Sequence, residues 1–233
     1  MGLERLTDRV CYFPHQAEVD RPMLAYLRGD RFSLAIDAGY SAKHVDDFYR
    51  LLDEAGLKRP DFTAITHWHY DHTFGMFHIH GVSIACQETN RFLKQQQAKV
   101  CDASYIDVLK NSDPYFAREY IQETTLKIVQ ADLQFQGQLV LDLGGITAQI
   151  FHTEAPHSED SVCVYVPEEK ILFLGDSVCE DVFHNGYMDK EKLRKLMDMI
   201  EQKDCVYCLL SHDEPLQKNA LLEDLYGVLH GTV

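Results

Sequence analysis

Apolar residues along the chain fall into short runs separated by polar or glycine-containing turns. Residues 23–27 and 32–36 are two such runs, and Arg28-Gly-Asp-Arg31 joins them, so we predict a β-hairpin with Gly-Asp as its turn. Other apolar runs have the length and residue types of strands. They predict strands at 62–66, 82–86, 139–143, 146–152, 161–166, 171–174 and 205–210.

Helices are predicted where apolar residues recur at intervals of three and four. Residues 42–55 have this spacing, with Ser41 suited to cap the start of the helix and Gly56 to end it. Further helices are predicted from Asp71 onward and at 191–202 and 217–229. Strands that are interrupted by helices in this way indicate an α+β fold of two sheets packed face to face with helices outside. We expect one domain over residues 1–233.

The segment 87–136 differs from the rest because it is polar, helix-prone and without strand alternation. We interpret it as an inserted helical cover. Its aromatic and basic side chains are candidates to line the mouth of a substrate pocket, with Arg118 receiving a substrate carboxylate, although core packing would explain the same residues. These candidates are Tyr105, Tyr115, Phe116, Arg118 and Tyr120.

Composition limits the kinds of molecule that the protein is expected to bind. The 233 residues are 45% hydrophobic and 11% aromatic, which is enough to form a substantial core. Lys and Arg number 22 against 37 Asp and Glu, a net charge of -15, and this argues against nucleic acid as a partner. No apolar run approaches the roughly 20 residues of a membrane span. We therefore expect a small-molecule substrate and leave the oligomeric state open.

Cysteine usage and the first residues bear on the compartment. Seven cysteines are spread along the chain without the spacing of a disulfide framework, and residues 1–10 contain no apolar run typical of a signal peptide. These features predict a cytoplasmic protein with reduced thiols. Cys205 and Cys208 form a C-x-x-C, but the apolar run around them is typical of a buried strand.

The chemically informative stretch is Thr66-His-Trp-His-Tyr-Asp-His-Thr73, which directly follows a predicted strand. Imidazole and carboxylate are the ligands of zinc, iron and manganese. A loop that leaves a strand can turn His67 and His69 toward one point, while Asp71 and His72 project toward a second point nearby. Four such residues could serve two metal ions separated by roughly 3.5–4 Å.

With this motif the chain resembles the metallo-β-lactamase superfamily, whose fold is a four-layer αββα sandwich of two mixed sheets. Four further elements resemble family elements in order and spacing. They are Leu34-Ala-Ile-Asp-Ala-Gly39, Ala155-Pro-His-Ser-Glu-Asp-Ser-Val162, Leu172-Phe-Leu-Gly-Asp-Ser177 and Leu210-Ser-His-Asp213. Position 176 is an aspartate, whereas antibiotic-degrading members commonly have cysteine there. In this respect the chain resembles the glyoxalase-like and lactonase-like branches.

The resemblance implies a ligand set for two metal ions. His67, His69 and His157 would hold the first ion, and Asp71, His72 and His212 the second. Asp176 would bridge the two ions. Asp37 is similar to a family residue that orients the ligand side chains.

The resemblance also implies a hydrolase. A hydroxide held between two metal ions, most simply zinc with iron or manganese as alternatives, would attack an ester, thioester, lactone or phosphodiester, and Asp71 would transfer a proton. An alternative on the same fold is iron-dependent redox chemistry, as in persulfide dioxygenases or diiron proteins that reduce oxygen or nitric oxide. A third hypothesis is a non-catalytic member in which the metal ions only stabilise the fold.

Overall fold

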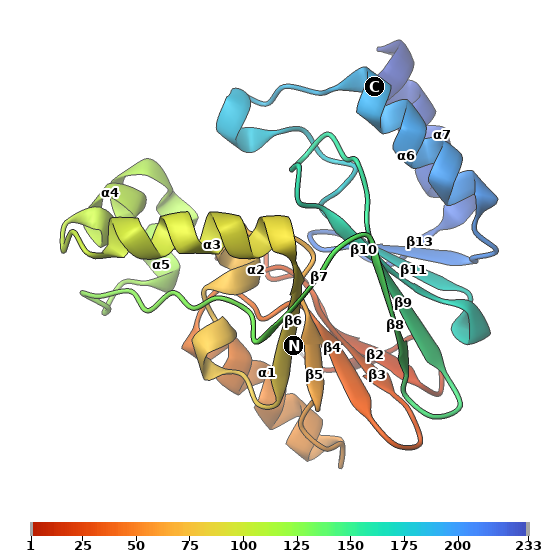
Figure 1. The fold of residues 1–233 in the computed structure, drawn as a ribbon, viewed down its shortest axis with the longest axis horizontal. Helices are drawn as coiled ribbons and strands as arrows, with labels where there is room; N and C mark the ends of the chain where they lie inside the picture. Colours follow the sequence, from red (N-terminus) through yellow and green to blue (C-terminus); the bar gives the residue numbers. More distant parts are fainter. Residues whose placement is uncertain (1, 232–233) are drawn as a thin grey trace.

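The computed structural model describes residues 2–231 and contains two β-sheets with helices on their outer sides (Figure 1). The first sheet is ordered β1-β2-β3-β4-β5-β6-β7, with β1 (Glu4–Arg5), β2 (Val10–Phe13), β3 (Leu24–Arg28), β4 (Ser33–Ile36), β5 (Phe62–Ala64), β6 (Val82–Cys86) and β7 (Leu133–Phe135). The second is ordered β13-β12-β11-β10-β9-β8, with β8 (Gln138–Asp142), β9 (Thr147–His152), β10 (Val162–Val166), β11 (Ile171–Gly175), β12 (Tyr207–Leu210) and β13 (Leu216–Gln217).

Both sheets mix parallel and antiparallel pairs. Strands β4 to β7 are parallel neighbours, as are β11 and β12, and the remaining pairs are antiparallel. The helices are α1 (Ala42–Glu54), α2 (Tyr70–Thr73), α3 (Gln87–Val100), α4 (Tyr105–Ser112), α5 (Pro114–Glu119), α6 (Lys190–Gln202) and α7 (Lys218–His230). Short 3₁₀ turns occur at η1 (Met76–His78), η2 (Pro167–Glu169) and η3 (Val182–His184).

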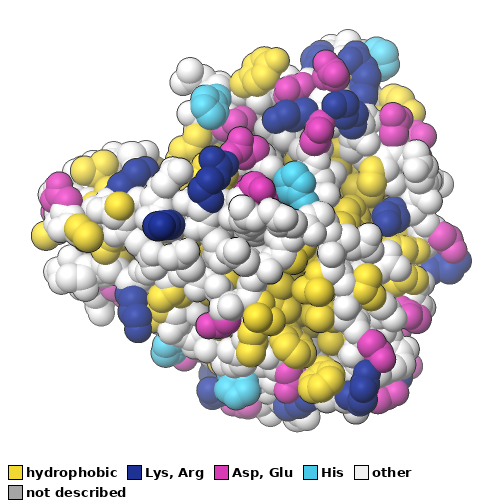
Figure 2. Space-filling model, viewed as in Figure 1, with side chains coloured by type: hydrophobic (Ala, Val, Ile, Leu, Met, Phe, Trp, Pro, Cys, Tyr) yellow, Lys and Arg dark blue, Asp and Glu magenta, His cyan; other side chains and the backbone are white. Residues whose placement is uncertain are grey.

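The central core lies between the two sheets. Alternate residues of a strand point to opposite faces, so Ala25 and Leu27 of β3 face the second sheet and meet residues such as Val164 and Phe173. The intervening residues Leu24 and Tyr26 face outward and are equally buried. Both faces of the inner strands are therefore apolar, as a strand covered on two sides requires. In Figure 2 hydrophobic side chains gather in the middle of one face, over the space between the sheets.

Helices cover the outer faces and complete four layers. Helix α1 packs its apolar residues on the first sheet, and Ser41 caps it by accepting a hydrogen bond from the backbone N–H of His44. Helices α6 and α7 pack on the second sheet (Figure 1). The predicted αββα sandwich is confirmed. Of the residues that the structure describes, none forms a helix long and apolar enough to cross a membrane.

The segment 87–136 forms helices α3, α4 and α5 beside the first sheet, with Phe116 buried in their core (Figure 1). It also contains strand β7, which pairs in parallel with β6 and was not predicted. Leu133 is 51% exposed, and the short edge strand shows no apolar alternation from which it could be predicted. Strands β1, β2 and β13 were also missed.

The sheets are joined by backbone contacts at one end. The N–H groups of Arg31 and Phe32, in the β3–β4 turn, both donate to the carbonyl of Leu143 in the β8–β9 turn at 3.0 Å. A Cβ at Gly29 would lie 2.1 Å from the same carbonyl oxygen, so only glycine permits this approach. The opposite end of the sandwich, where β4, β5, β9, β11 and β12 terminate, carries the polar side chains.

Candidate metal centre

Each predicted ligand follows the carboxyl end of a strand, and these ends lie at one edge of the sandwich. His67 and His69 lie in the loop after β5, and Asp71 and His72 begin the short helix α2. From the second sheet, His157 follows β9, Asp176 follows β11 and His212 follows β12. Residues separated by up to 145 positions in the sequence, such as His67 and His212, therefore meet because of the strand order.

Three histidines form the first cluster, with potential ligand atoms within 4.8 Å of one another: His67, His69 and His157. All three are buried. His157 Nε2 lies 3.0 Å from His69 Nδ1, and His157 Nδ1 lies 2.8 Å from the carbonyl oxygen of Glu180. His67 Nδ1 contacts Thr66 Oγ1 at 3.1 Å, so His67 Nε2 is directed toward the other two rings.

Two carboxylates and two histidines form the second cluster: Asp71, His72, Asp176 and His212. His72 Nε2 lies 3.2 Å from Asp71 Oδ2 and 3.2 Å from Asp176 Oδ2. His212 Nε2 lies 3.2 Å and 3.4 Å from the same two oxygens. Asp176 Oδ2 is also 3.6 Å from His157 Nε2 and 3.8 Å from His67 Nε2, so this carboxylate lies between the clusters.

The electrostatics of the two clusters differ. Burial lowers the pKa of His67 well below its usual range and that of His69 to about 3, so both rings are neutral and offer lone pairs. Burial alone would also lower the pKa of His72, but the carboxylates of Asp71 and Asp176 override it and raise that pKa. The second cluster therefore attracts positive charge.

These residues suit divalent cations. Within the described part of the chain, His67 Nε2 and Asp176 Oδ1 are buried atoms without a hydrogen-bond partner, and both belong to the converging groups. Unpaired buried polar atoms are rare in native proteins and require an explanation. Metal coordination supplies one, because neutral imidazole and carboxylate are the ligands preferred by zinc and similar ions.

Asp37 supports the second cluster through a contact with His72. Its Oδ2 lies 2.8 Å from His72 Nδ1, and its Oδ1 accepts a hydrogen bond of 2.7 Å from the backbone N–H of Thr66. Asp37 itself has a left-handed backbone, with φ of 64°. The contact with Nδ1 leaves His72 Nε2 facing Asp71 and Asp176.

Two further residues, Asp20 and His15, contact the cluster and were not predicted. Asp20 Oδ1 lies 3.1 Å from His212 Nδ1 and 3.0 Å from His15 Nε2. Together these three groups could also surround a cation. Asp20 and His212 are 192 positions apart, and no motif surrounds either His15 or Asp20. The sequence indicated only that His and Asp, which are able to bind a metal ion, occur in the segment before β3.

A cavity of about 410 Å³ opens beside both clusters. Its lining includes the carboxylates of Asp71 and Asp113 and the apolar side chains of Val182 and Phe183, which are more than half exposed. Phe183 packs on His69 and Trp68, with ring centroids 4.7 and 5.1 Å apart. No Lys or Arg is among the residues that line this cavity.

The predicted pocket residues of the helical segment lie outside this cavity. Phe116 is fully buried against Tyr120, Tyr105 bonds Gln96, and Arg118 donates to the carbonyl of Glu18 while its guanidinium lies over the ring of Tyr115. The segment instead reaches the cavity through Asp113, whose carboxylate accepts a hydrogen bond from the hydroxyl of Tyr70.

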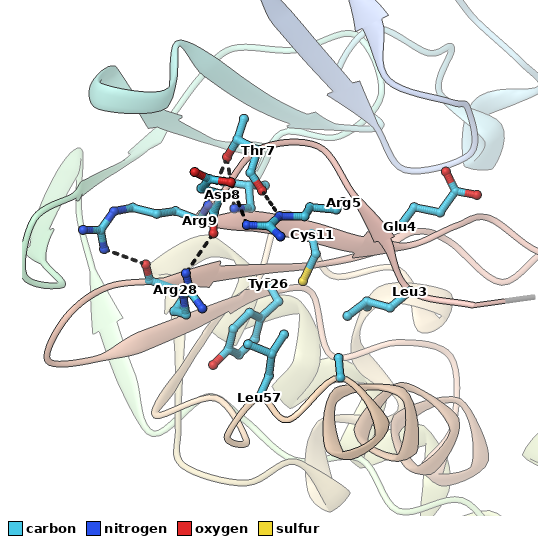
Figure 3. Close-up of a pocket in the computed structure, with 12 residues that line it drawn as sticks. Leu3, Glu4, Arg5, Thr7, Asp8, Arg9, Cys11, Tyr26, Arg28 and Leu57 are labelled. Atoms are coloured by element: carbon cyan, nitrogen blue, oxygen red, sulfur yellow. Dashed lines mark hydrogen bonds and ion pairs between the residues drawn. The ribbon is translucent and has the colours of Figure 1, made fainter.

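A second cavity, of about 220 Å³, lies at the other end of the first sheet (Figure 3). Arg5, Arg9 and Arg28 line it above an apolar floor that includes Cys11. Arg5 pairs with Asp8, Arg9 pairs with Asp30, and Arg28 donates to the carbonyl of Asp8. These arginines are already engaged, so this cavity is a poor anion site.

Sequence comparison shows to which family the chain belongs. The profile of the metallo-beta-lactamase superfamily matches residues 24–212, and the chain belongs to this superfamily. Two similar curated proteins are both called acyl-coenzyme A thioesterase MBLAC2. The one from Gallus gallus is 29% identical over 167 residues and the one from Homo sapiens is 25% identical over 169. These matches cover 68% of this chain, but only 58% and 59% of the relatives.

Solved structures show the same fold at low sequence identity. A metallo-beta-lactamase from Pontibacter korlensis superposes with a TM-score of 0.69 and 16% identity, over 98% of both chains. The sec-alkylsulfatase Pisa1 from Pseudomonas sp. superposes with a TM-score of 0.71 and 12% identity, over 98% of this chain and 41% of that one. These likenesses establish the fold, and the chemistry must be argued from the site itself.

Proposed function

We propose that this protein is a metal-dependent hydrolase of carboxylic thioesters, with two divalent metal ions, most simply zinc, at the centre described above. The observation that carries the proposal is the convergence of six potential ligands around a seventh, Asp176, beside an open cavity. His67, His69 and His157 would hold one ion, Asp71, His72 and His212 the other, with Asp176 between them. Asp37 would orient His72.

Metal ions bound here would lower the pKa of a water molecule and polarise the carbonyl of the substrate. The protein supplies the remaining functions. Asp71 lines the cavity, and its Oδ2 faces both His72 and His212, so its carboxylate is placed to take up a proton and pass it to the leaving thiolate. Phe183 and Val182 offer an apolar wall for the acyl group.

The choice of a thioester over an ester or lactone rests on the names of the relatives, and the choice over a phosphodiester rests also on the cavity. Relatives that match over 68% of this chain, at 29% and 25% identity, are named acyl-coenzyme A thioesterases. In addition, the cavity is lined by carboxylates and apolar groups without a Lys or Arg. This lining argues against a phosphodiester, because an anionic group at the scissile bond would meet carboxylates and no basic side chain.

A cytoplasmic location is proposed from the thiols. All seven cysteines are free, and Cys11, Cys86, Cys163, Cys205 and Cys208 are buried. Such thiols persist in a reducing compartment.

The test compares wild type with Asp176→Asn. We expect about two zinc ions per chain in the wild type by elemental analysis, at least one fewer in the variant, and a fall of about 100-fold in acyl-coenzyme A hydrolysis measured by release of free thiol. Asp46→Asn is the control, because Asp46 forms a surface pair with His78. A single iron, or turnover that persists without metal, would contradict the proposal and redirect the work to persulfide and oxygen assays.

A further inference from the structure

We propose that Asp20, supported by His15, is a positioning residue that orients His212 as a metal ligand. The proposal rests on the proposed function, since it concerns the second metal position. It adds a segment, residues 14–22 before β3, to the machinery of the site.

The two nitrogens of His212 have different surroundings. Nε2 faces the cluster, 3.2 Å from Asp71 Oδ2 and 3.4 Å from Asp176 Oδ2. Nδ1 faces the other way, 3.1 Å from Asp20 Oδ1. A carboxylate at Nδ1 holds the proton on that nitrogen, which leaves the Nε2 lone pair for a metal and makes it more basic.

His15 holds Asp20 in this position. Its Nε2 lies 3.0 Å from the same Asp20 oxygen, and its ring meets the ring of His212 edge to face, with centroids 5.1 Å apart. His15, Asp20 and His212 thus form a compact triangle in which each group contacts the other two. Such packing restricts the rotation of the His212 ring, which is only partly buried.

The backbone of the segment is built to present Asp20. Asp20 has φ of 54°, a left-handed conformation that residues other than glycine and asparagine or aspartate seldom adopt. The bridge between Gln16 and Arg21 closes the loop, with backbone hydrogen bonds of 3.0 and 3.3 Å. Met23 N–H then donates to the carbonyl of Ser211 at 2.6 Å, directly before His212.

A buried ion pair fixes the loop to the rest of the molecule. The guanidinium of Arg21 donates two hydrogen bonds of 2.8 Å to the carboxylate of Glu119 at the end of α5, and both side chains are at most 4% exposed. The helical segment therefore reaches the metal centre indirectly, through Arg21 and the neighbouring Asp20.

The arrangement repeats what Asp37 does for His72. Asp37 contacts His72 Nδ1 at 2.8 Å, also from a left-handed backbone. Asp37 lies within residues 24–212, the range that matches the superfamily, whereas His15 and Asp20 precede that range. The second support therefore comes from a part of the chain that lies outside the matched range.

The test is the metal affinity of Asp20→Gly and Asp20→Asn. Glycine removes the carboxylate and still accepts the left-handed backbone, while asparagine keeps an acceptor oxygen without the charge. For Asp20→Gly we expect the zinc ion at the second position to bind about 10- to 100-fold less tightly in chelator competition, with a smaller loss for Asp20→Asn. After cobalt substitution, the visible spectrum of the second position should change while that of the three-histidine position is retained.

Asp46→Asn is the matched control, because it removes a carboxylate that contacts His78 at 2.8 Å on the surface. The inference would be overturned if Asp20→Gly kept the metal affinity and the cobalt spectrum of a wild type that binds two ions. The proposed function would then still stand. A wild type that binds no metal would overturn the inference together with the proposed function. The stability of the metal-free proteins is measured as well. If Asp20→Gly lowers the free energy of unfolding of the metal-free protein by as much as it lowers the free energy of metal binding, the role of Asp20 is structural and the inference also fails.

Discussion

Asp132 shows how one carboxylate can secure the end of an inserted segment. Its Oδ2 accepts hydrogen bonds from the backbone N–H of Ser83 at 2.9 Å and from the Ser83 hydroxyl at 2.7 Å. The backbone N–H of Asp132 in turn donates to Ser83 Oγ at 2.9 Å. These contacts join β6 to the residue before β7, where the helical segment returns to the first sheet.

The hydrogen bond from the backbone N–H of Ser83 is the main cause that lowers the pKa of Asp132 below 3.8, and the hydrogen bond from the Ser83 hydroxyl lowers it further. A carboxyl group whose pKa is lower in the folded protein stabilises the fold above its ordinary pKa, and this contribution disappears as the pH falls through the folded pKa. We expect Asp132→Ala to lower the free energy of unfolding by about 1 kcal/mol at pH 7. Urea titrations at pH 7, 5 and 3 should show the two proteins converging toward pH 3, and a difference that grows with acid would contradict this account.

Among single residues, those inside a local motif were predictable from the sequence. His67, His69, Asp71 and His72 follow one strand within six positions, so their proximity could be predicted without the fold. His157, Asp176 and His212 required the family resemblance, because only the strand order brings them together. His15 and Asp20 have neither kind of signal, since their contact with His212 depends on how one loop folds.

At the scale of elements, the Arg21–Glu119 pair connects the loop before β3 to helix α5. Removing one member of a buried pair leaves the other charge without compensation, at a cost of about 3–5 kcal/mol. We expect a loss of this size in the free energy of unfolding for Arg21→Met, measured by urea denaturation.

The matched control is Arg50→Met, because Arg50 forms an exposed pair with Glu54 at 2.8 Å. Exposed pairs contribute about 0–1 kcal/mol, so this variant should remain close to wild type. Arg21→Met with Glu119→Leu should recover part of the loss, because the buried carboxylate is then gone, while the partly exposed Asp47, which Arg21 also contacts at 3.1 Å, remains without its partner. Equal effects of Arg21→Met and Arg50→Met would contradict the importance of the buried pair.

Prediction of elements succeeded where periodicity was strong. Helix α1 and strands β6 and β10 lie within a residue of their predicted bounds, since buried faces impose a regular apolar pattern. Strands β1, β7 and β13 have two or three residues each at or near sheet edges, where a pattern cannot develop. The aromatic residues of the segment 87–136 were considered for a pocket, but Phe116 and Tyr120 are buried in its own core.

At the scale of the molecule, the proposed metal ions would hold the two sheets together, because each sheet contributes ligands to both positions. A ligand that binds only the folded state stabilises it by about 2.7 kcal/mol when present at 100 times its dissociation constant. In a chain of this size, each kcal/mol of stability changes the unfolding temperature by about 2–4 °C. Since two ions are bound, we expect chelation to lower the unfolding temperature by about 10–20 °C. Calorimetry before chelation, after it and after zinc is restored tests this, and an unchanged transition would show that the ions do not link the sheets.

The backbone contacts between the β3–β4 turn and Leu143 have a consequence for motion. They fasten the sheets at the end away from the metal centre. At the metal end, the N–H of Met23 donates to Ser211 O at 2.6 Å and the N–H of Val162 donates to Thr66 O at 2.7 Å, so the two layers are joined there as well. Because Thr66 and Ser211 directly precede His67 and His212, opening of the sandwich at the ligands would require these two bonds to break. The amide protons of Met23 and Val162 should therefore exchange slowly even without metal.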